Sequence, residues 1–257
     1  MKSTVSTPLR LRGLEFGGPR PLFCIPLVAA TLASLVDQAT VAGRLKPDLI
    51  EWRADFFSEA SADALVHAAG VLRALAHEPA IIFTLRVKRE GGAQDLDQPT
   101  RRALIEAVLR TRTIDIVDLE LANERPFLDA LMPLARTCGT RVLLAMHNFD
   151  ETPASDVLLG HVRAMRALGT DIAKIAVMPR TPDDVLRLLQ VTASARREFP
   201  DLPLATMSMG ALGSLTRVAG FLYGSDMAFA VGQAASAPGQ IPIEDARRTT
   251  ELLLRYS

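Results

Sequence analysis

Eight short apolar runs alternate with longer amphipathic stretches from residue 22 to the C-terminus. Short runs rich in β-branched residues predict strands, and the amphipathic stretches between them predict helices. An alternation of this kind is typical of βα units around a parallel sheet. We expect the strands at residues 22–28, 48–52, 80–86, 114–120, 141–147, 171–177, 203–209 and 226–231.

The length of the chain favours a single closed barrel. Its 257 residues match the usual size of one (β/α)8 domain, and no linker, charge block or low-complexity tract interrupts the series. We therefore expect one domain over residues 1–257, of class α/β, with the fold of a (β/α)8 TIM barrel. A doubly wound open sheet is the alternative, since the alternation alone separates the two poorly. Within residues 1–21, two apolar pieces that flank Gly13 are expected to form a hairpin that closes the barrel bottom.

The charge balance excludes a general attraction to nucleic acid or to an anionic membrane. Twenty-nine basic residues are matched by twenty-nine acidic ones, so the chain has no overall field.

The cysteines and the N-terminal segment bear on the cellular compartment. Cys24 and Cys138 form no CxxC pair, which fits a reducing compartment better than a disulfide or zinc framework. The N-terminal segment lacks the apolar core of a secretory signal, and no run is long enough for a membrane span. We expect a soluble, cytoplasmic protein.

Lys174 is the most unusual residue in the predicted strands. It lies at the centre of DIAKIAV, residues 171–177, whose composition predicts a buried strand. Burial disfavours a charged ammonium and favours the neutral amine, the form that attacks a ketone to give a Schiff base. For a strand lysine taken alone, a side chain that reaches from the strand end to water is the more frequent explanation. The other polar residues at the strand ends favour the nucleophile.

Polar side chains gather at the carboxyl ends of the predicted strands, where barrel enzymes hold their catalytic groups. Taken singly, such charges usually form solvated loops or structural ion pairs, and a lone histidine is more often a satisfied core group. Together they would supply an acid or base, an orienting carboxylate, cations and a nucleophile. We expect His147 to move protons and Glu90 to fix the tautomer of its ring. The set comprises Glu51, Arg53 and Asp55 after the second strand, Arg86 and Glu90 after the third, His147 at the fifth and Lys174 on the sixth.

Two further loops carry glycine and polar residues that suit an anion. Residues 208–214 precede a helix that contains Arg217, and residues 232–240 contain Ser236 and Gln240. Loops in these places often bind phosphate through helix N-terminal amides, but this pair could equally clamp a carboxylate. The second loop could also close as a lid.

A metal site is the main rival for the charged set at the strand ends. The cations of Arg53, Arg86 and Lys174 would repel a divalent ion, and only His147 offers an obvious nitrogen ligand. We therefore expect no metal.

Seven ordered segments carry a resemblance that spans nearly the whole chain. They are IEWRADFF (50–57), FTLR with EGG (83–86 and 90–92), DLEL (118–121), HNF with a following TP (147–153), KIAVMP with DVLRLL (174–189), TMSMG (206–210) and SAPGQ (236–240). In order and spacing these segments resemble the type I 3-dehydroquinate dehydratases, the Schiff-base lyases of the shikimate pathway. A lone EGG or HNF would mean little, whereas seven ordered matches are highly specific.

The resemblance implies a hydro-lyase of aromatic amino acid biosynthesis that converts 3-dehydroquinate to 3-dehydroshikimate by syn loss of water. Lys174 would form an imine with the C3 ketone. His147 would remove the C2 proton and then protonate the departing C1 hydroxyl, while Glu90 orients it. The resemblance also implies a homodimer that uses no cofactor.

The same resemblance implies a set of substrate-binding residues. Glu51, Arg53 and Arg86 would hold ring hydroxyls and neighbouring polar groups, Arg217 would pair with the carboxylate, and Ser236 and Gln240 would reach that end from the closing loop. Met207 and Phe229 are expected to be apolar walls of the pocket, and Asp55 to be structural.

Three positions depart from the family pattern. Pro26 stands where many members carry a polar residue near the substrate, Asn148 where aspartate is common, and Ala93 where a charged residue is frequent. None of the three removes a proposed catalytic group, but Pro26 puts one substrate contact in question.

Two other functions remain as alternatives. A Schiff-base aldolase acting on a phosphorylated sugar would need a phosphate site at residues 208–214, and it gives the EWR and SAPGQ segments no role. A barrel that binds quinate-like ligands or a partner protein without turnover would not need both Lys174 and His147.

Overall fold

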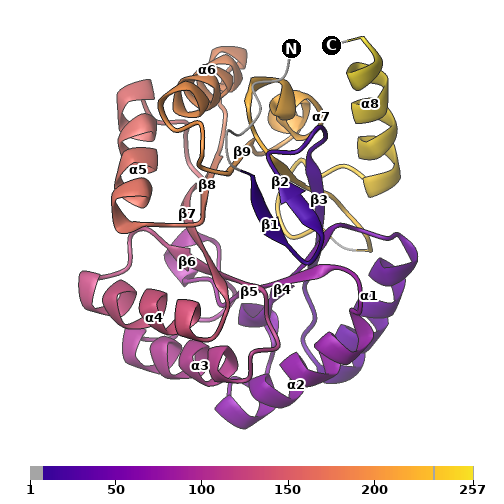
Figure 1. The fold of residues 1–257 in the computed structure, drawn as a ribbon, viewed down its shortest axis with the longest axis vertical. Coiled ribbons are helices and arrows are strands. Elements are labelled where there is room, and N and C mark those ends of the chain that lie inside the picture. Colours follow the sequence, from indigo (N-terminus) through magenta and orange to yellow (C-terminus); the bar gives the residue numbers. More distant parts are fainter. Residues whose placement is uncertain (1–7, 234, 257) are drawn as a thin grey trace.

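The computed structural model describes residues 8–233 and 235–256, so residues 1–7 of the expected N-terminal extension lie outside the described part (Figure 1). Eight parallel strands form one sheet in the order β10-β3-β4-β5-β6-β7-β8-β9, which confirms the (β/α)8 barrel rather than the open sheet. The strands are β3 (Leu22–Leu27), β4 (Leu49–Arg53), β5 (Ala80–Thr84), β6 (Ile116–Glu120), β7 (Arg141–Asn148), β8 (Ile172–Val177), β9 (Leu204–Ser208) and β10 (Met227–Phe229).

Helices surround the sheet and connect successive strands (Figure 1). Several begin at a side-chain cap: the side chains of Thr31, Ser61 and Asp97 each accept a hydrogen bond from an amide three residues on. Within the described residues, no helix combines the length and apolar character needed to cross a bilayer. The helices are α1 (Leu32–Arg44), α2 (Ala62–Leu75), α3 (Gln98–Arg110), α4 (Arg125–Thr137), α5 (Ser155–Leu168), α6 (Pro182–Glu198), α7 (Leu215–Ala219) and α8 (Ile243–Arg255).

The predicted N-terminal hairpin is present. Strands β1 (Leu9–Leu11) and β2 (Leu14–Phe16) pair antiparallel, and Gly13 in the turn adopts a φ of 77°. The apolar side chains of the hairpin pack against the cluster of residues inside the barrel, with Phe16 fully buried. The hairpin therefore closes the end of the barrel at which the strands begin.

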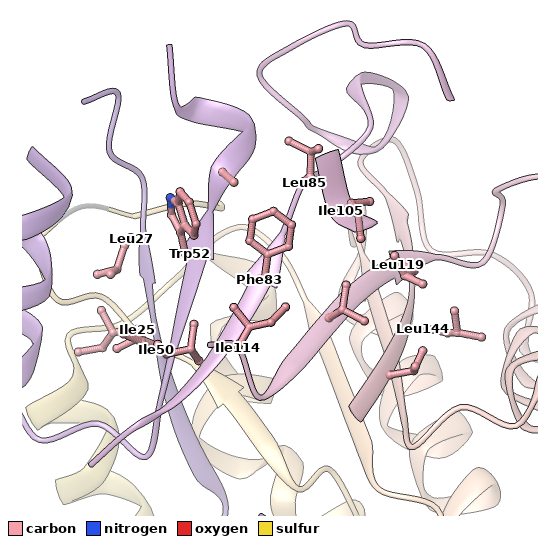
Figure 2. Close-up of a cluster of buried hydrophobic side chains, with 14 of the residues drawn as sticks. Ile25, Leu27, Ile50, Trp52, Phe83, Leu85, Ile105, Ile114, Leu119 and Leu144 are labelled. Carbon is pink, nitrogen blue, oxygen red and sulfur yellow. The ribbon is translucent and has the colours of Figure 1, made fainter. Parts of the chain in front are cut away.

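Strand alternation divides the core into two layers. On β4, Ile50 and Trp52 face the helices, whereas Leu49 belongs to the cluster inside the barrel. Figure 2 shows the outer layer, in which the Trp52 ring packs edge-on against Phe83 with centroids 5.3 Å apart. Because successive side chains alternate, this outer packing forces Glu51 into the barrel.

The seam between β9 and β10 is closed by side chains and by one backbone hydrogen bond, from Asp226 N to Leu204 O at 2.6 Å. Within residues 8–233 and 235–256, no strand ladder joins these two strands. Instead the carboxylate of Asp226 accepts from Leu204 N at 2.9 Å, and Ser225 Oγ accepts from Thr206 N at 3.0 Å. Arg196, from α6, donates to the same Asp226 carboxylate. A buried ion pair thus closes the circle at the bottom of the barrel.

Candidate active site

One cavity at the carboxyl end of the barrel contains every residue that the sequence predicts for the site. Strand register explains this, because all eight parallel strands end on the same face and their inward side chains converge. Met207 and Phe229, which the resemblance implies to be apolar walls, also line the cavity. The predicted lining residues are Glu51, Arg53, Arg86, Glu90, His147, Lys174, Arg217, Ser236 and Gln240.

Lys174 is buried rather than directed to water. Its side chain projects from the middle of β8 between Ala145 of β7 and Ala205 of β9, whose small side chains leave room for it. Lys174 is 4% exposed, and its Nζ lies 2.9 Å from Asp118 Oδ2 and 3.5 Å from Glu51 Oε1. The desolvation that the sequence predicts is therefore accompanied by two ion pairs.

Sequence reasoning missed two acidic residues, Asp118 and Glu120 on β6. Both are buried, and both bind Arg86, at 2.7 Å and 3.1 Å respectively. Burial opposes the ionised form of Asp118, but Arg86 and Lys174 together lower its pKa. The available signal was the spacing: two acids two positions apart in an otherwise apolar strand must share one face.

One carboxylate oxygen of Glu90 contacts both the backbone amide and the ring of His147. Oε2 of Glu90 accepts from His147 N at 3.1 Å and lies 3.0 Å from His147 Nδ1. A carboxylate there fixes the ring proton on Nδ1 and leaves Nε2 free to accept a proton. Burial lowers the pKa of His147 well below its usual range, and the cations of Arg86 and Lys174 lower it further. Burial also raises the pKa of Glu90 to about 7.

Asp55 holds Arg53 in place. Its two carboxylate oxygens accept from Arg53 Nε and Nη2, each at 2.8 Å, and Oδ2 also accepts from Ala93 N at 3.0 Å. Arg53 donates in addition to Gly91 O at 3.0 Å. Asp55 is fully buried, and all the contacts given above are with the protein itself. They match the structural role expected for Asp55.

Arg217 is a buried cation without a carboxylate. It is 3% exposed, and its guanidinium contacts Met207 Sδ at 3.6 Å, Phe229 O at 3.5 Å and Pro238 O at 3.2 Å. In the described part of the chain, no Asp or Glu forms an ion pair with it, and burial lowers its pKa to about 10. Such a group is available for an anionic ligand.

Several amides of the loop at residues 208–214 already donate within the protein. Ser208 N donates to Thr216 Oγ1, Met209 N to Val177 O and Gly210 N to Pro238 O. These three donors are therefore not available to a phosphate, whereas Arg217 offers a buried cation to a carboxylate.

Residues 236–240 of the second loop are folded on themselves at the cavity. Gln240 Oε1 accepts from Ser236 N at 2.9 Å, and Gln240 Nε2 donates to Ser236 Oγ at 3.2 Å. Gly239 has a φ of 76°, and a Cβ there would lie 2.1 Å from Gly210 O. Only glycine permits this contact between the two loops.

Comparison with known proteins identifies the family. The model of the type I 3-dehydroquinase family matches residues 23–256. The chain belongs to this family. It is accordingly an enzyme of the hydro-lyase class, which removes water from its substrate.

Individual members of the type I 3-dehydroquinase family are similar over almost their full length. The 3-dehydroquinate dehydratase of Geobacillus thermodenitrificans is 43% identical over 251 residues, which cover 97% of each chain. The crystal structure of the Geobacillus kaustophilus enzyme superposes with a TM-score of 0.96 at 43% identity and covers 100% of both chains. The type I enzyme of Clostridium difficile, with covalently modified comenic acid, has a TM-score of 0.94 at 29% identity and covers 99% of this chain and 100% of its own.

The three departures from the family pattern lie beside the site without displacing its polar groups. Pro26 is buried on β3 and pairs in register with Glu51. Asn148 Oδ1 accepts from the amides of Asp150 and Glu151, each at 2.9 Å, so its side chain orders the loop after β7. Ala93 contributes its backbone amide to Asp55. The charged set of the site is complete without them.

Proposed function

We propose that the chain dehydrates 3-dehydroquinate to 3-dehydroshikimate through an imine on Lys174, with His147 as the general acid and base. Membership of the type I 3-dehydroquinase family supports the overall reaction, dehydration of dehydroquinate in the shikimate pathway. The mechanism rests on one observation: a buried lysine, a histidine held by a carboxylate and an unpaired arginine line a single cavity.

Imine formation prepares the substrate for proton loss. The neutral amine of Lys174 adds to the C3 ketone, and the resulting carbinolamine loses its hydroxyl as water to leave a protonated imine. This cation withdraws electrons from the adjacent C2–H bond and so acidifies it. Asp118, 2.9 Å from Nζ, supplies the negative charge beside the imine nitrogen.

His147 then transfers one proton from carbon to oxygen. Its lowered pKa keeps the ring neutral near pH 7, so that Nε2 accepts the C2 proton. Ionised Glu90 at Nδ1 stabilises the imidazolium that forms. The imidazolium returns the proton to the C1 hydroxyl, which leaves as water from the same face. A second water hydrolyses the imine and regenerates Lys174, so the net change is the loss of one water.

Polar and charged groups that line the cavity orient the substrate. Arg217 pairs with the substrate carboxylate, and Ser236 and Gln240 reach that end from their loop. The ring hydroxyls lie at Glu51, Arg53 and Arg86.

The test is intact-mass analysis after incubation with 3-dehydroquinate and sodium borohydride, followed by peptide mapping. We expect a reduced adduct on Lys174 at the mass of the dehydrated product, and none in Lys174→Ala. In His147→Ala the adduct should form but retain the mass of the undehydrated substrate for longer. Absence of an adduct from the folded wild-type chain would exclude the imine mechanism and favour binding without turnover.

The cytoplasmic location and the homodimer stay predictions. Sedimentation analysis of the purified chain should give twice the monomer mass of 27.8 kDa.

A further inference from the structure

A buried row of alternating charges connects helix α3 to Lys174. Arg101 Nη2 donates to Glu120 Oε2 at 2.7 Å, and Glu120 Oε1 accepts from Arg86 Nη1 at 3.1 Å. Arg86 Nη2 donates to Asp118 Oδ2 at 2.7 Å, the same oxygen that accepts from Lys174 Nζ at 2.9 Å. The row begins on a helix outside the barrel and ends at the proposed nucleophile.

Arg101 does not line the cavity, but its side chain is buried and makes several hydrogen bonds. It is 2% exposed and donates to Leu85 O at 2.9 Å and to Asn123 Oδ1 at 3.1 Å. Its guanidinium lies 5.3 Å from the centre of the Phe127 ring. Arg101 and Asn123 Nδ2 therefore hold one Glu120 oxygen, at 2.7 and 2.9 Å, while Val87 N and Arg86 bind the other.

The hold of Asp118 on Lys174 depends on this arrangement. Oδ2 of Asp118 accepts from both Arg86 and Lys174, and its Oδ1 has no hydrogen-bond partner among the residues that the structure describes. Arg86 in turn is shared between Asp118 and Glu120. Without Arg101, the uncompensated charge of Glu120 would draw Arg86 away from Asp118. The Asp118 carboxylate would then hold the Lys174 ammonium more strongly, and the amine would be released at higher pH.

We propose that Arg101 is a positioning residue for the reaction: through Glu120 and Arg86 it limits how strongly Asp118 binds the Lys174 ammonium, and so sets the pH at which the amine becomes reactive. The proposal rests on the proposed imine at Lys174. The titratable and charged groups around Lys174, from each neighbouring element, are Cys24 on β3, Glu51 on β4, Arg86 after β5, Asp118 and Glu120 on β6, and His147 on β7.

The experiment measures the rate of adduct formation with 3-dehydroquinate and sodium cyanoborohydride between pH 5 and 9. Arg101→Met should move the midpoint of the pH profile upward by about 0.5 to 1 unit, which lowers the rate below the midpoint ~3- to 10-fold. Glu120→Gln should move it downward, because it removes the opposite charge and keeps an acceptor for Arg86. The double variant should return close to the wild-type midpoint.

Arg196→Met is the matched control, since Arg196 is also a buried arginine that joins an outer helix to a buried carboxylate, that of Asp226 just before β10, at the opposite end of the barrel. It should leave the midpoint unchanged. An unchanged midpoint in folded Arg101→Met, or equal shifts in the control, would overturn the proposal. Shifts of the midpoint in the same direction for Arg101→Met and Glu120→Gln would also overturn the proposal. Lost packing alone would shift both midpoints alike, whereas the proposed effect of charge shifts them in opposite directions. If Arg101→Met does not fold, the downward shift in Glu120→Gln decides. Absence of any adduct in the wild type would instead overturn the proposed function.

Discussion

At the scale of single residues, Glu90 and His147 have pKa values in the reverse of their usual order, with the carboxyl above the imidazole. Burial raises the pKa of Glu90 to about 7 and lowers that of His147 well below its usual range. Near pH 7 the imidazole is therefore neutral, and the carboxyl is close to its midpoint. Because the pKa of His147 is lowered, the imidazolium that forms is a strong acid, which suits the proposed return of the proton to the leaving hydroxyl.

The raised pKa of Glu90 also predicts a dependence of stability on pH. Between the ordinary value of 4.5 and about 7, the folded chain binds a proton that the unfolded chain has lost, so this residue destabilises the fold as pH rises through that range. Glu90→Gln removes the titration. In urea unfolding, its stability relative to wild type should rise by on the order of 3 kcal/mol between pH 4 and pH 8. Glu244→Gln, on the exposed face of α8, should show a constant difference. A constant difference for Glu90→Gln as well would contradict the raised pKa.

Arg217→Met should damage binding more than turnover. The guanidinium has no carboxylate partner in the described residues, so its charge is free for the substrate. Loss of a charge-assisted pair of about 1.5 to 3 kcal/mol corresponds to a rise in KM of roughly 10- to 100-fold. Steady-state kinetics with 3-dehydroquinate gives the KM and kcat separately. A KM within twofold of wild type would show that the carboxylate binds elsewhere.

At the scale of elements, the alternation of side chains along each strand decides which residues enter the site. The same two-residue period that places Trp52 outside places Glu51 inside, and it places Asp118 and Glu120 inside together. The two-residue spacing of the acids on β6 is visible in the sequence. From the sequence alone they received no role in the site, because the spacing does not reveal which residues they bind. Those partners come from α3, β8 and the segment after β5.

The contact between two loops predicts the effect of Gly239→Ala. A Cβ would lie 2.1 Å from Gly210 O, and the positive φ adds strain of about 1 to 2 kcal/mol. The loop should move from Gly210, withdrawing Ser236 and Gln240, so KM should rise roughly tenfold while the free energy of unfolding falls through the backbone strain.

Gly139→Ala provides the matched control for that substitution. Gly139 has a φ of 80°, but a Cβ there meets nothing within 4 Å and the residue lies outside the cavity. The control should lose stability through backbone strain and keep its KM. Equal KM values for both variants would mean that the loop contact does not shape the site.

At the scale of the whole molecule, closure of the barrel depends on a few buried contacts. Arg196 donates to Leu202 O, Gly224 O and the Asp226 carboxylate, and thereby joins α6 to the seam between β9 and β10. Arg196→Met leaves the carboxylate buried without its cation. We expect a loss of about 3 to 5 kcal/mol in the free energy of unfolding by urea.

A surface ion pair is the control for the seam. Arg163 binds Glu198 at 2.7 and 2.8 Å between exposed positions, and Arg163→Met should change the unfolding midpoint little. Equal effects of the two substitutions would show that burial at the seam adds nothing.

The amino-acid sequence determined the strands, the helices, the hairpin at the barrel bottom and the residues that line the cavity. The elements and the charged residues at the strand ends follow from local periodicity and from the common end of parallel strands, whereas the walls Met207 and Phe229 were expected from the resemblance to the family. Only the tertiary structure decided which charges pair. Lys174 and Asp118 are 56 residues apart, and Arg217 is left for a ligand only because its neighbours are carbonyls and a thioether. Side-chain pairing depends on the stagger and spacing of elements distant in sequence, and no local pattern encodes those distances.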